Sequence, residues 1–554
     1  MNKKVCSFPI LFALLALVIG TCAVVFPASA QAAPTSTGSI TVSGTVARSY
    51  DAYQIFSANV VDGDSDAKIA TDLAWASDAV RDAALPVLHS AGMPNSQTTA
   101  QEAAEWLNAD SHLTSALSAQ LARSLQSSDA VPLNAGTASE LPCGYWLIVA
   151  DDDSIAQGEA GTAPVMALVG GSAVTVKPKA ATPKVVKHVL EDSTAAWQKA
   201  ADATVADDLY WRLSATVPAG LAAYDTYTVQ FVDTMSAGLD PSKVAASMRV
   251  YVAAGVDGGF DAASTGKDGR AGTDPAKGWT DITAQCATKV AADGKSFTVR
   301  TGDLIAALGG ADAFTAGARV VAVYNAPLNS ACNHGIAKGN SNEVYLRYPR
   351  SPFADQSGDA GFTRTPSDDA CAYTWDLALT KRGSDGDKPL AGAVLSIADD
   401  RGRTLAADGT WDAEGKATVT TGEDGRVTVS GADSGKLEVR ELKAPKGYTA
   451  FESTRSVTVK AEGLDVDQVA AAKPKLTITA ESPLRADNAD GSTGSLEASL
   501  INTPAGTPPS IFTGGFMPLT GDTAMFTAAA VAVVGAALIV VALLVKRGGG
   551  SYKE

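Results

Sequence analysis

Histidine and cysteine are scarce in this sequence, which has four histidines and six cysteines among 554 residues. The histidines, His89, His112, His188 and His334, are isolated, and none belongs to a His-Glu-x-x-His or similar metal-binding motif. The sequence has no recognisable Ser/His/Asp arrangement and no glycine-rich phosphate-binding loop. These absences argue against the common hydrolase, zinc-enzyme and nucleotide-binding classes. They predict a chain that is not an enzyme and binds no metal or cofactor.

Positive charge is also in short supply. Lysine and arginine number 44 against 60 aspartates and glutamates, and the formal net charge is −16. No stripe of basic residues with interleaved aromatics is present. Because phosphate backbones and anionic headgroups repel an acidic chain, nucleic acid and anionic lipid are not expected partners.

A long apolar run lies at each end of the chain. At the N-terminus, Lys3 and Lys4 precede an apolar segment over 8–26, and small residues follow at 28–30. This order is typical of a secretory signal peptide, predicted over 1–30. Cleavage after residue 30 is favoured, with residues 32 and 33 as alternatives.

At the C-terminus, residues 523–545 carry no charge and are long enough to cross a bilayer as a helix. Lys546 and Arg547 follow and mark the cytoplasmic side. A short motif precedes the run: Met517, Pro518, Leu519, Thr520 and Gly521. On these residues alone, a plain membrane anchor is the alternative interpretation.

The few cysteines are compatible with an exported protein. Four remain after signal removal, and an exported compartment permits disulfides. Cys286 and Cys332 fall in one predicted domain and could pair, whereas Cys143 and Cys371 fall in different domains. Their spacing matches no zinc pattern.

Roughly 490 residues remain between the terminal segments, which suggests about three domains. Residues 34–175 combine strand-like ends with helical spacing over 71–90 and 99–126, and predict an α+β domain. Short alternating strands over 176–350 and again over 370–503 predict two β-sandwiches. Residues 351–369 and 504–516 are predicted linkers, and 517–554 is a separate terminal segment. The fold class is mainly β.

Three polar residues of the last predicted domain share strand parity with core residues. Lys381 lies two and four residues after Leu379 and Leu377, so the three share one face of a strand. Asn502 and Glu441 share a face with apolar residues of their own strands in the same way. Unpaired burial of such groups costs several kcal/mol, so they should contact one another. Burial also favours a neutral amine and a protonated acid, which makes the lysine a nucleophile and the acid a proton relay. A buried lysine–glutamate ion pair beside a hydrogen-bonded asparagine is the unreactive alternative.

These segments carry a family resemblance. LALTKRGSDGDKPLAGAVL (377–395), LEVRELKAPKGY (437–448) and ASLINTP (498–504) resemble the first strand, the E-box and the last strand of Cna-B-like pilin domains. The resemblance implies an Ig-like sandwich with an intramolecular isopeptide bond. It assigns Lys381 and Asn502 as the condensing pair and Glu441 as the promoting acid.

The preceding domain resembles a Cna-A-type pilin domain. PKVVKHV (183–189), TVQFVDTMSAGL (228–239) and GNSNEVYLRY (339–348) match its first, acidic and final strands. The resemblance implies a bond between Lys187 and Asn342, promoted by Asp233. Asn340 has the same parity as Asn342 and stays an alternative acceptor. YDAYQIFSA (50–58) and GYWLIVAD (144–151) resemble the first domain of Gram-positive fimbrial subunits.

The C-terminal motif resembles the Leu-Pro-x-Thr-Gly sorting signal, with Met517 in place of leucine. The resemblance implies that a sortase cuts the Thr520–Gly521 bond and passes the acyl group to an amine. In shaft pilins that amine is a connector lysine after a Val-x-Val-Tyr-Pro pattern. Lys179 fits that position, while Lys177 stands where tyrosine is expected and competes with it. A stiff basic spacer whose lysines are merely solvated is the alternative.

Taken together, these resemblances predict a subunit of a covalent surface pilus, exported, held briefly in the membrane and then attached to peptidoglycan. Expected partners are pilus-class and housekeeping sortases, identical subunits joined head to tail, and peptidoglycan. Minor pilins and host surface ligands are left open. The alternative is a monomeric wall-anchored adhesin or minor pilin, which needs no connector lysine.

Overall fold

The computed structural model describes residues 36–44, 48–64, 67–109, 112–178, 182–255, 278–314, 317–335, 337, 339–451, 453–490 and 493–506. Among these residues, none of the helices has the length and apolar character needed to cross a membrane. The predicted signal peptide, Lys179 and the sorting segment with Thr520 lie outside them.

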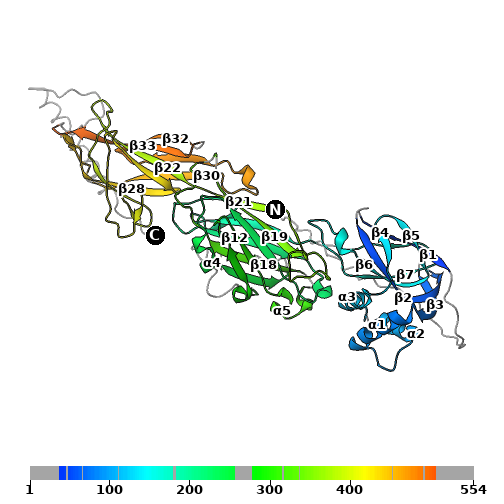
Figure 1. The fold of residues 1–554 in the computed structure, drawn as a ribbon. Helices are drawn as coiled ribbons and strands as arrows, with labels where there is room; N and C mark the ends of the chain where they lie inside the picture. Colours follow the sequence, from blue (N-terminus) through cyan, green and yellow to red (C-terminus); the bar gives the residue numbers. More distant parts are fainter. Residues whose placement is uncertain are drawn as a thin grey trace, which may run out of the picture.

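The described chain forms three domains that follow one another in a row (Figure 1). An α+β domain comes first, and two domains built almost entirely from strands follow. The predicted mainly β chain with tandem sandwiches after an α+β domain is therefore confirmed.

The first domain packs three helices against a sheet. Its strands are β1 (Thr37–Val42), β2 (Ser49–Asp62), β3 (Lys68–Trp75), β4 (Val131–Asn134), β5 (Ala138–Pro142), β6 (Gly144–Ala150), β7 (Val165–Val169) and β8 (Val174–Val176), and its helices are α1 (Asp78–Ser90), α2 (Ala100–Asn108) and α3 (Ser115–Leu125). The sheet order is β3-β2-β6-β7 with β4 beside β2, and β5-β1-β8 forms a smaller second sheet. A shared core that includes Phe56, Leu88 and Leu121 joins the larger sheet to the helices.

The helices begin at side-chain caps, and this explains one error of the sequence prediction. Ser77 accepts a hydrogen bond from the Val80 amide, so α1 cannot begin before Asp78. Residues 71–75, predicted as helical, instead end β3 and pair with β2. The alanine-rich spacing continues across the boundary, but only the cap marks where the helix starts.

The middle domain is a sandwich of two sheets. Its strands are β9 (Lys184–Glu191), β10 (Ala196–Gln198), β11 (Ala200–Asp202), β12 (Tyr210–Val217), β13 (Gln230–Met235), β14 (Arg249–Ala254), β15 (Thr280–Asp281), β16 (Ala287–Val290), β17 (Ser296–Arg300), β18 (Ala318–Asn325), β19 (Asn340–Pro349), β20 (Phe362–Arg364) and β21 (Asp368–Tyr373), with short helices α4 (Val244–Ser247) and α5 (Leu304–Ala307). One sheet has the order β10-β9-β12-β18-β14-β15, and the other has the order β11-β21-β19-β13-β17-β16 with β20 beside β19. Their facing sides form one apolar core.

The linker predicted over 351–369 is wrong in its second half. β20 and β21 both pair antiparallel with β19, so the middle domain extends to Tyr373. Phe362 and Ala370 are buried in this segment. The polar composition of this segment is typical of a linker. Its backbone nevertheless forms hydrogen bonds with β19, whose edge would otherwise be unpaired.

The C-terminal domain is a second sandwich. Its strands are β22 (Trp375–Gly383), β23 (Val394–Ala398), β24 (Thr404–Leu405), β25 (Trp411–Asp412), β26 (Val419–Thr420), β27 (Arg426–Ala432), β28 (Gly435–Lys443), β29 (Tyr448–Thr449), β30 (Arg455–Glu462), β31 (Lys475–Ala480), β32 (Leu484–Asp490) and β33 (Ser495–Pro504). One sheet has the order β27-β22-β33-β29 with β32 beside β33, and the other has the order β25-β24-β23-β28-β30-β31 with β26 beside β23. β22 and β33, the first and last strands, pair in parallel.

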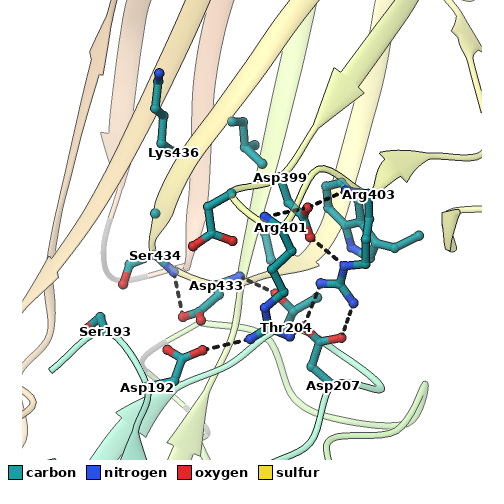
Figure 2. Close-up of a pocket in the computed structure, with 15 residues that line it drawn as sticks. Asp192, Ser193, Thr204, Asp207, Asp399, Arg401, Arg403, Asp433, Ser434 and Lys436 are labelled. Atoms are coloured by element: carbon teal, nitrogen blue, oxygen red, sulfur yellow. Dashed lines mark hydrogen bonds and ion pairs between the residues drawn. The ribbon is translucent and has the colours of Figure 1, made fainter. Parts of the chain in front are cut away.

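The two sandwiches meet at a polar junction around a pocket of about 520 Å³ (Figure 2). Arg401, in the turn between β23 and β24, lies 2.9 Å from Asp207 and 3.0 Å from Asp192 of the middle domain. Arg403 donates a further hydrogen bond of 2.7 Å to Asp207. Ion pairs therefore connect the domains here, and apolar contacts add to them, because Cys371 and Tyr373 of β21 share a core cluster with Trp375 of β22.

Candidate functional site

The C-terminal sandwich brings Lys381, Glu441 and Asn502 together in its core. Lys381 lies on β22 and Asn502 on the adjacent β33, while Glu441 reaches them from β28 in the opposite sheet. Strand alternation turns all three side chains inward, and each is at most 5% exposed. The predicted residues of this domain are thus neighbours.

The contacts hold the asparagine amide by its nitrogen. Asn502 Nδ2 donates to Glu441 Oε1 at 2.9 Å and to Oε2 at 3.0 Å. Lys381 Nζ lies 3.6 Å from Glu441 Oε1 and donates to the Leu500 carbonyl at 3.2 Å. Among the described residues, Asn502 Oδ1 has no hydrogen-bond partner.

Burial changes the chemistry of this lysine. Desolvation lowers the pKa of Lys381 to about 8, although the nearby Glu441 carboxylate acts in the opposite direction. A neutral amine, which can act as a nucleophile, is therefore accessible near neutral pH.

The middle sandwich holds a second such cluster. Lys187 lies on β9, and Asp233 and Asn342 lie on β13 and β19 of the other sheet. All three are fully buried. Lys187 Nζ donates a short hydrogen bond to Asp233 Oδ2. Aromatic rings surround the amine, with Trp211 and Tyr324 each 5.6 Å away from ring centroid to Nζ.

Burial shifts the titration of both charged groups. Desolvation lowers the pKa of Lys187 to about 8, against the opposing effect of Asp233. Desolvation likewise raises the pKa of Asp233, and the nearby lysine only partly offsets this. Both shifts reduce the preference for the ion pair and make the neutral amine with the protonated acid easier to reach.

The two candidate acceptor asparagines of β19 differ in their surroundings. Asn340 is fully used: its oxygen accepts from the Asn333 amide at 2.8 Å, and its nitrogen donates to the carbonyls of Asn333 and Ala372. Asn342 Nδ2 instead donates to Tyr324 Oη at 2.9 Å, within the lysine cluster. Asn340 therefore stabilises the loop that contains Asn333, whereas Asn342 shares the Tyr324 hydroxyl with the Lys187 amine.

The sequence analysis missed Tyr324. It lies on β18 and contacts all three members of the middle cluster. The available signal was its parity with Val320 and Ala322, which places its hydroxyl on the core face. A buried tyrosine hydroxyl needs a polar partner, but parity does not reveal which one.

The connector begins at an ordered strand. β8 pairs in parallel with β1 through Val174 opposite Ile40, and Val176 is buried. Lys177 follows directly and is exposed. The competing candidate, Lys179, lies outside the described residues.

The possible Cys286–Cys332 disulfide does not form in the structure: both thiols are free, as are Cys143 and Cys371. Cys286 Sγ donates to the Ile282 carbonyl at 3.3 Å. Cys332 lies in a different loop, whose backbone packs against Gly238. Membership of one domain did not place the two thiols against each other.

Sequence comparison identifies relatives for part of the chain. Residues 376–473 match the family model described as SpaA, a prealbumin-like fold domain. The trypsin-resistant surface T6 protein of Streptococcus pyogenes serotype M6 is 29% identical over 143 residues, which are 24% of this chain and 24% of that protein. The match thus spans about a quarter of the length of that curated relative.

Solved structures with similar folds include backbone pilins. The T6 backbone pilin of serotype M6 Streptococcus pyogenes aligns with a TM-score of 0.44 and 15% identity, over 86% of this chain and 100% of that chain. The full-length major pilin SpaD from Corynebacterium diphtheriae aligns with a TM-score of 0.41 and 16% identity, over 85% and 98%. By sequence, residues 376–473 are similar to the SpaA-type prealbumin-like fold domains.

Proposed function

We propose that this chain is the shaft subunit of a covalently polymerised surface pilus, with one Lys–Asn isopeptide bond inside each β-sandwich. The observation that carries the proposal is the repeated buried cluster of lysine, acid and asparagine, linking the first strand of each sandwich to a late one. Two copies of one unusual arrangement in one chain support a shared chemistry. The similarity to the T6 surface protein supports the same reading.

The bond in the C-terminal domain forms by condensation. The neutral Nζ of Lys381 attacks the Asn502 side-chain carbonyl carbon, and the C–Nδ2 bond breaks. Glu441, which holds Nδ2 by two hydrogen bonds, supplies the proton with which that nitrogen leaves as ammonia. The carboxylate then takes a proton from Nζ, so the acid is regenerated. Fixed proximity replaces an external catalyst.

The bonds define how tension passes through a folded subunit. Force that enters at β9 reaches Lys187 and continues through its side chain into Asn342, so residues 188–341 carry no load. The Lys381–Asn502 bond bypasses residues 382–501 in the same way. Each sandwich then resists extension by covalent bonds rather than by its hydrogen bonds, as a fibre under shear requires.

Assembly follows from the two ends of the chain. A sortase would cut after Thr520 and transfer its acyl group to Lys179 of the next subunit, with Lys177 as the competing amine. The order of β8 supports an attachment point there, because its pairing with β1 fixes the start of the connector. The last subunit would pass to peptidoglycan.

Intact-mass measurement of the folded chain tests the internal bonds. We expect a deficit of two ammonia molecules, and tryptic digestion should yield the branched peptides that join Lys187 to Asn342 and Lys381 to Asn502. Glu441→Gln keeps the hydrogen-bonding shape but not the acid, so it should abolish the second bond and leave the first. A wild-type mass without any deficit would refute the crosslinks.

Blotting of cell-wall extracts tests polymerisation. Lys179→Ala should collapse the high-mass ladder to monomer, with Lys177→Ala as the matched control. Loss of the ladder in the Lys177 variant alone would move the linkage to that residue. A ladder that survives both substitutions would contradict the proposed connector and place the linkage on another lysine. A wild-type chain without any ladder would instead favour a monomeric wall-anchored protein.

A further inference from the structure

Tyr324 occupies the centre of the middle-domain cluster. Its hydroxyl accepts from Lys187 Nζ at 3.0 Å, accepts from Asn342 Nδ2 at 2.9 Å and donates to Asp233 Oδ2 at 3.0 Å. The side chain is completely buried, and the Phe297 ring packs edge-on against it at 4.7 Å between centroids. One hydroxyl thus touches the amine, the acid and the amide.

The C-terminal cluster serves as a comparison, because no hydroxyl among the described residues bridges its lysine, acid and asparagine in this way. There, the asparagine nitrogen donates directly to both oxygens of the acid. In the middle domain, the corresponding nitrogen is held by Tyr324, and Asp233 contacts Lys187 and Tyr324. Asp233 Oδ1 and Asn342 Oδ1, both buried, have no hydrogen-bond partner among the described residues.

From this geometry, we propose that Tyr324 is a further catalytic residue of the middle-domain bond, carrying the proton from Asp233 to the departing nitrogen of Asn342. The inference rests on the proposed isopeptide chemistry and adds a role that the acid cannot fill through its own contacts.

The relay balances in protons. Lys187 first yields a proton to Asp233 along their hydrogen bond, which leaves a neutral amine and a protonated acid. Nζ attacks the side-chain carbonyl carbon of Asn342, Tyr324 passes its hydroxyl proton to Nδ2, and Asp233 restores that proton. The C–Nδ2 bond breaks, ammonia departs, and the Asp233 carboxylate takes one proton from Nζ. Tyrosine and acid return to their protonated forms beside a new secondary amide.

The surroundings of the hydroxyl suit a relay. Burial raises the pKa of Tyr324 well above its ordinary value, so the group stays protonated between transfers. Two buried rings line the cluster: Trp211 lies beside Lys187 Nζ, and Phe297 packs against Tyr324. The hydroxyl is therefore the polar group that connects acid and amide in the described cluster.

The test counts ammonia lost from the full chain, with the C-terminal bond as internal standard. In Tyr324→Phe we expect the Lys381–Asn502 bond to form normally and the Lys187–Asn342 bond to form at least about a hundredfold more slowly, the range expected for a lost proton transfer. Formation of both bonds at the wild-type rate would overturn the proposal. A wild-type chain that loses no ammonia would instead overturn the proposed function itself.

Two further variants separate proton transfer from packing. Phe297→Leu removes the ring against Tyr324 but leaves every hydroxyl contact, so it should keep both bonds; loss of the middle bond there would overturn the proposal. If Tyr324→Phe does not fold, fluorotyrosine at position 324 keeps the shape with a more acidic hydroxyl. The pH profile of middle-bond formation should then shift to lower pH, and an unchanged profile would overturn the proposal.

Discussion

The surroundings of two buried lysines lower the pKa of their amines. An exposed amine is protonated near neutral pH and cannot attack an amide. Lys187 and Lys381 instead lie in apolar cores that lower the pKa of each to about 8. The same desolvation makes an unreacted cluster costly, because a buried ion pair recovers little of the hydration that it loses. The proposed condensation would remove both charges and with them this cost.

The two asparagines of β19 give a matched pair of variants. Asn342→Ala should abolish the middle-domain bond, because it removes the amide beside Tyr324 and Lys187. Asn340→Ala should keep that bond but lower the free energy of unfolding by about 1–3 kcal/mol, because one buried and two partly buried hydrogen bonds are lost. Intact mass and a denaturant titration report the two effects. If the ammonia deficit falls from two to one in Asn340→Ala but stays at two in Asn342→Ala, the assignment would be reversed.

At the scale of elements, β21 shows how pairing can outweigh composition. Ala370 is buried in this strand between two neighbouring strands, although the preceding residues are rich in serine, aspartate and glycine. The strand also connects the two sandwiches, because β22 follows it after one residue.

Ala370→Asp should therefore destabilise the middle domain by roughly 3 kcal/mol or more, since it places a charge in the core. Ala360→Asp, the same change at an exposed position of the preceding segment, should be nearly neutral. Denaturant midpoints of the two variants provide the measurement. Equal midpoints would mean that the segment behaves as a linker after all.

Strand parity explains how far the sequence could predict these elements and sites. Lys381 and Asn502 lie at even spacings from leucines of their own strands, so the local sequence is enough to predict that their side chains point inward. Tyr324 and β21 depend on which distant strands pair, and nothing local specifies that register. The cysteine pairing failed for the same reason, because a shared domain does not determine contact.

At the scale of the whole molecule, the junction between the sandwiches depends on Asp207. This carboxylate binds both Arg401 and Arg403 of the C-terminal domain (Figure 2). Asp207→Asn should loosen the junction, visible as faster amide hydrogen exchange along β11 and the β23–β24 turn. Lys436→Ala is the control, because Lys436 lines the same pocket but pairs with Glu438 of its own domain. Equal exchange in both variants would contradict a role for the ion pairs.

The junction should also respond to pH. Burial, followed by the charge of Asp202, raises the pKa of Glu191 from 4.5 to about 7. The folded chain then binds more protons than the unfolded chain between these values, so this contribution to stability is complete below pH 4.5 and is lost as pH rises to about 7. The expected loss is on the order of 2–3 kcal/mol. Asp433 and Asp192 lie in the same acidic cluster and act in the same direction.

Melting temperatures of the full chain between pH 4.5 and 8 check this expectation. Glu191→Gln should flatten the decline, whereas Glu438→Gln, at an exposed ion pair, should leave it unchanged. A wild-type chain whose stability rises over this interval would show that other groups dominate.

The passage from β21 to β22 consists of Thr374 alone, and both sides hold it. Its carbonyl accepts from the Gly335 amide, and its hydroxyl donates to the Ala432 carbonyl. The flanking rings of Tyr373 and Trp375 stack at 5.9 Å. A connection this short and this well held transmits torque as well as tension, so the two sandwiches should rotate as one rigid unit. Bending of a filament would then concentrate at other connections between domains.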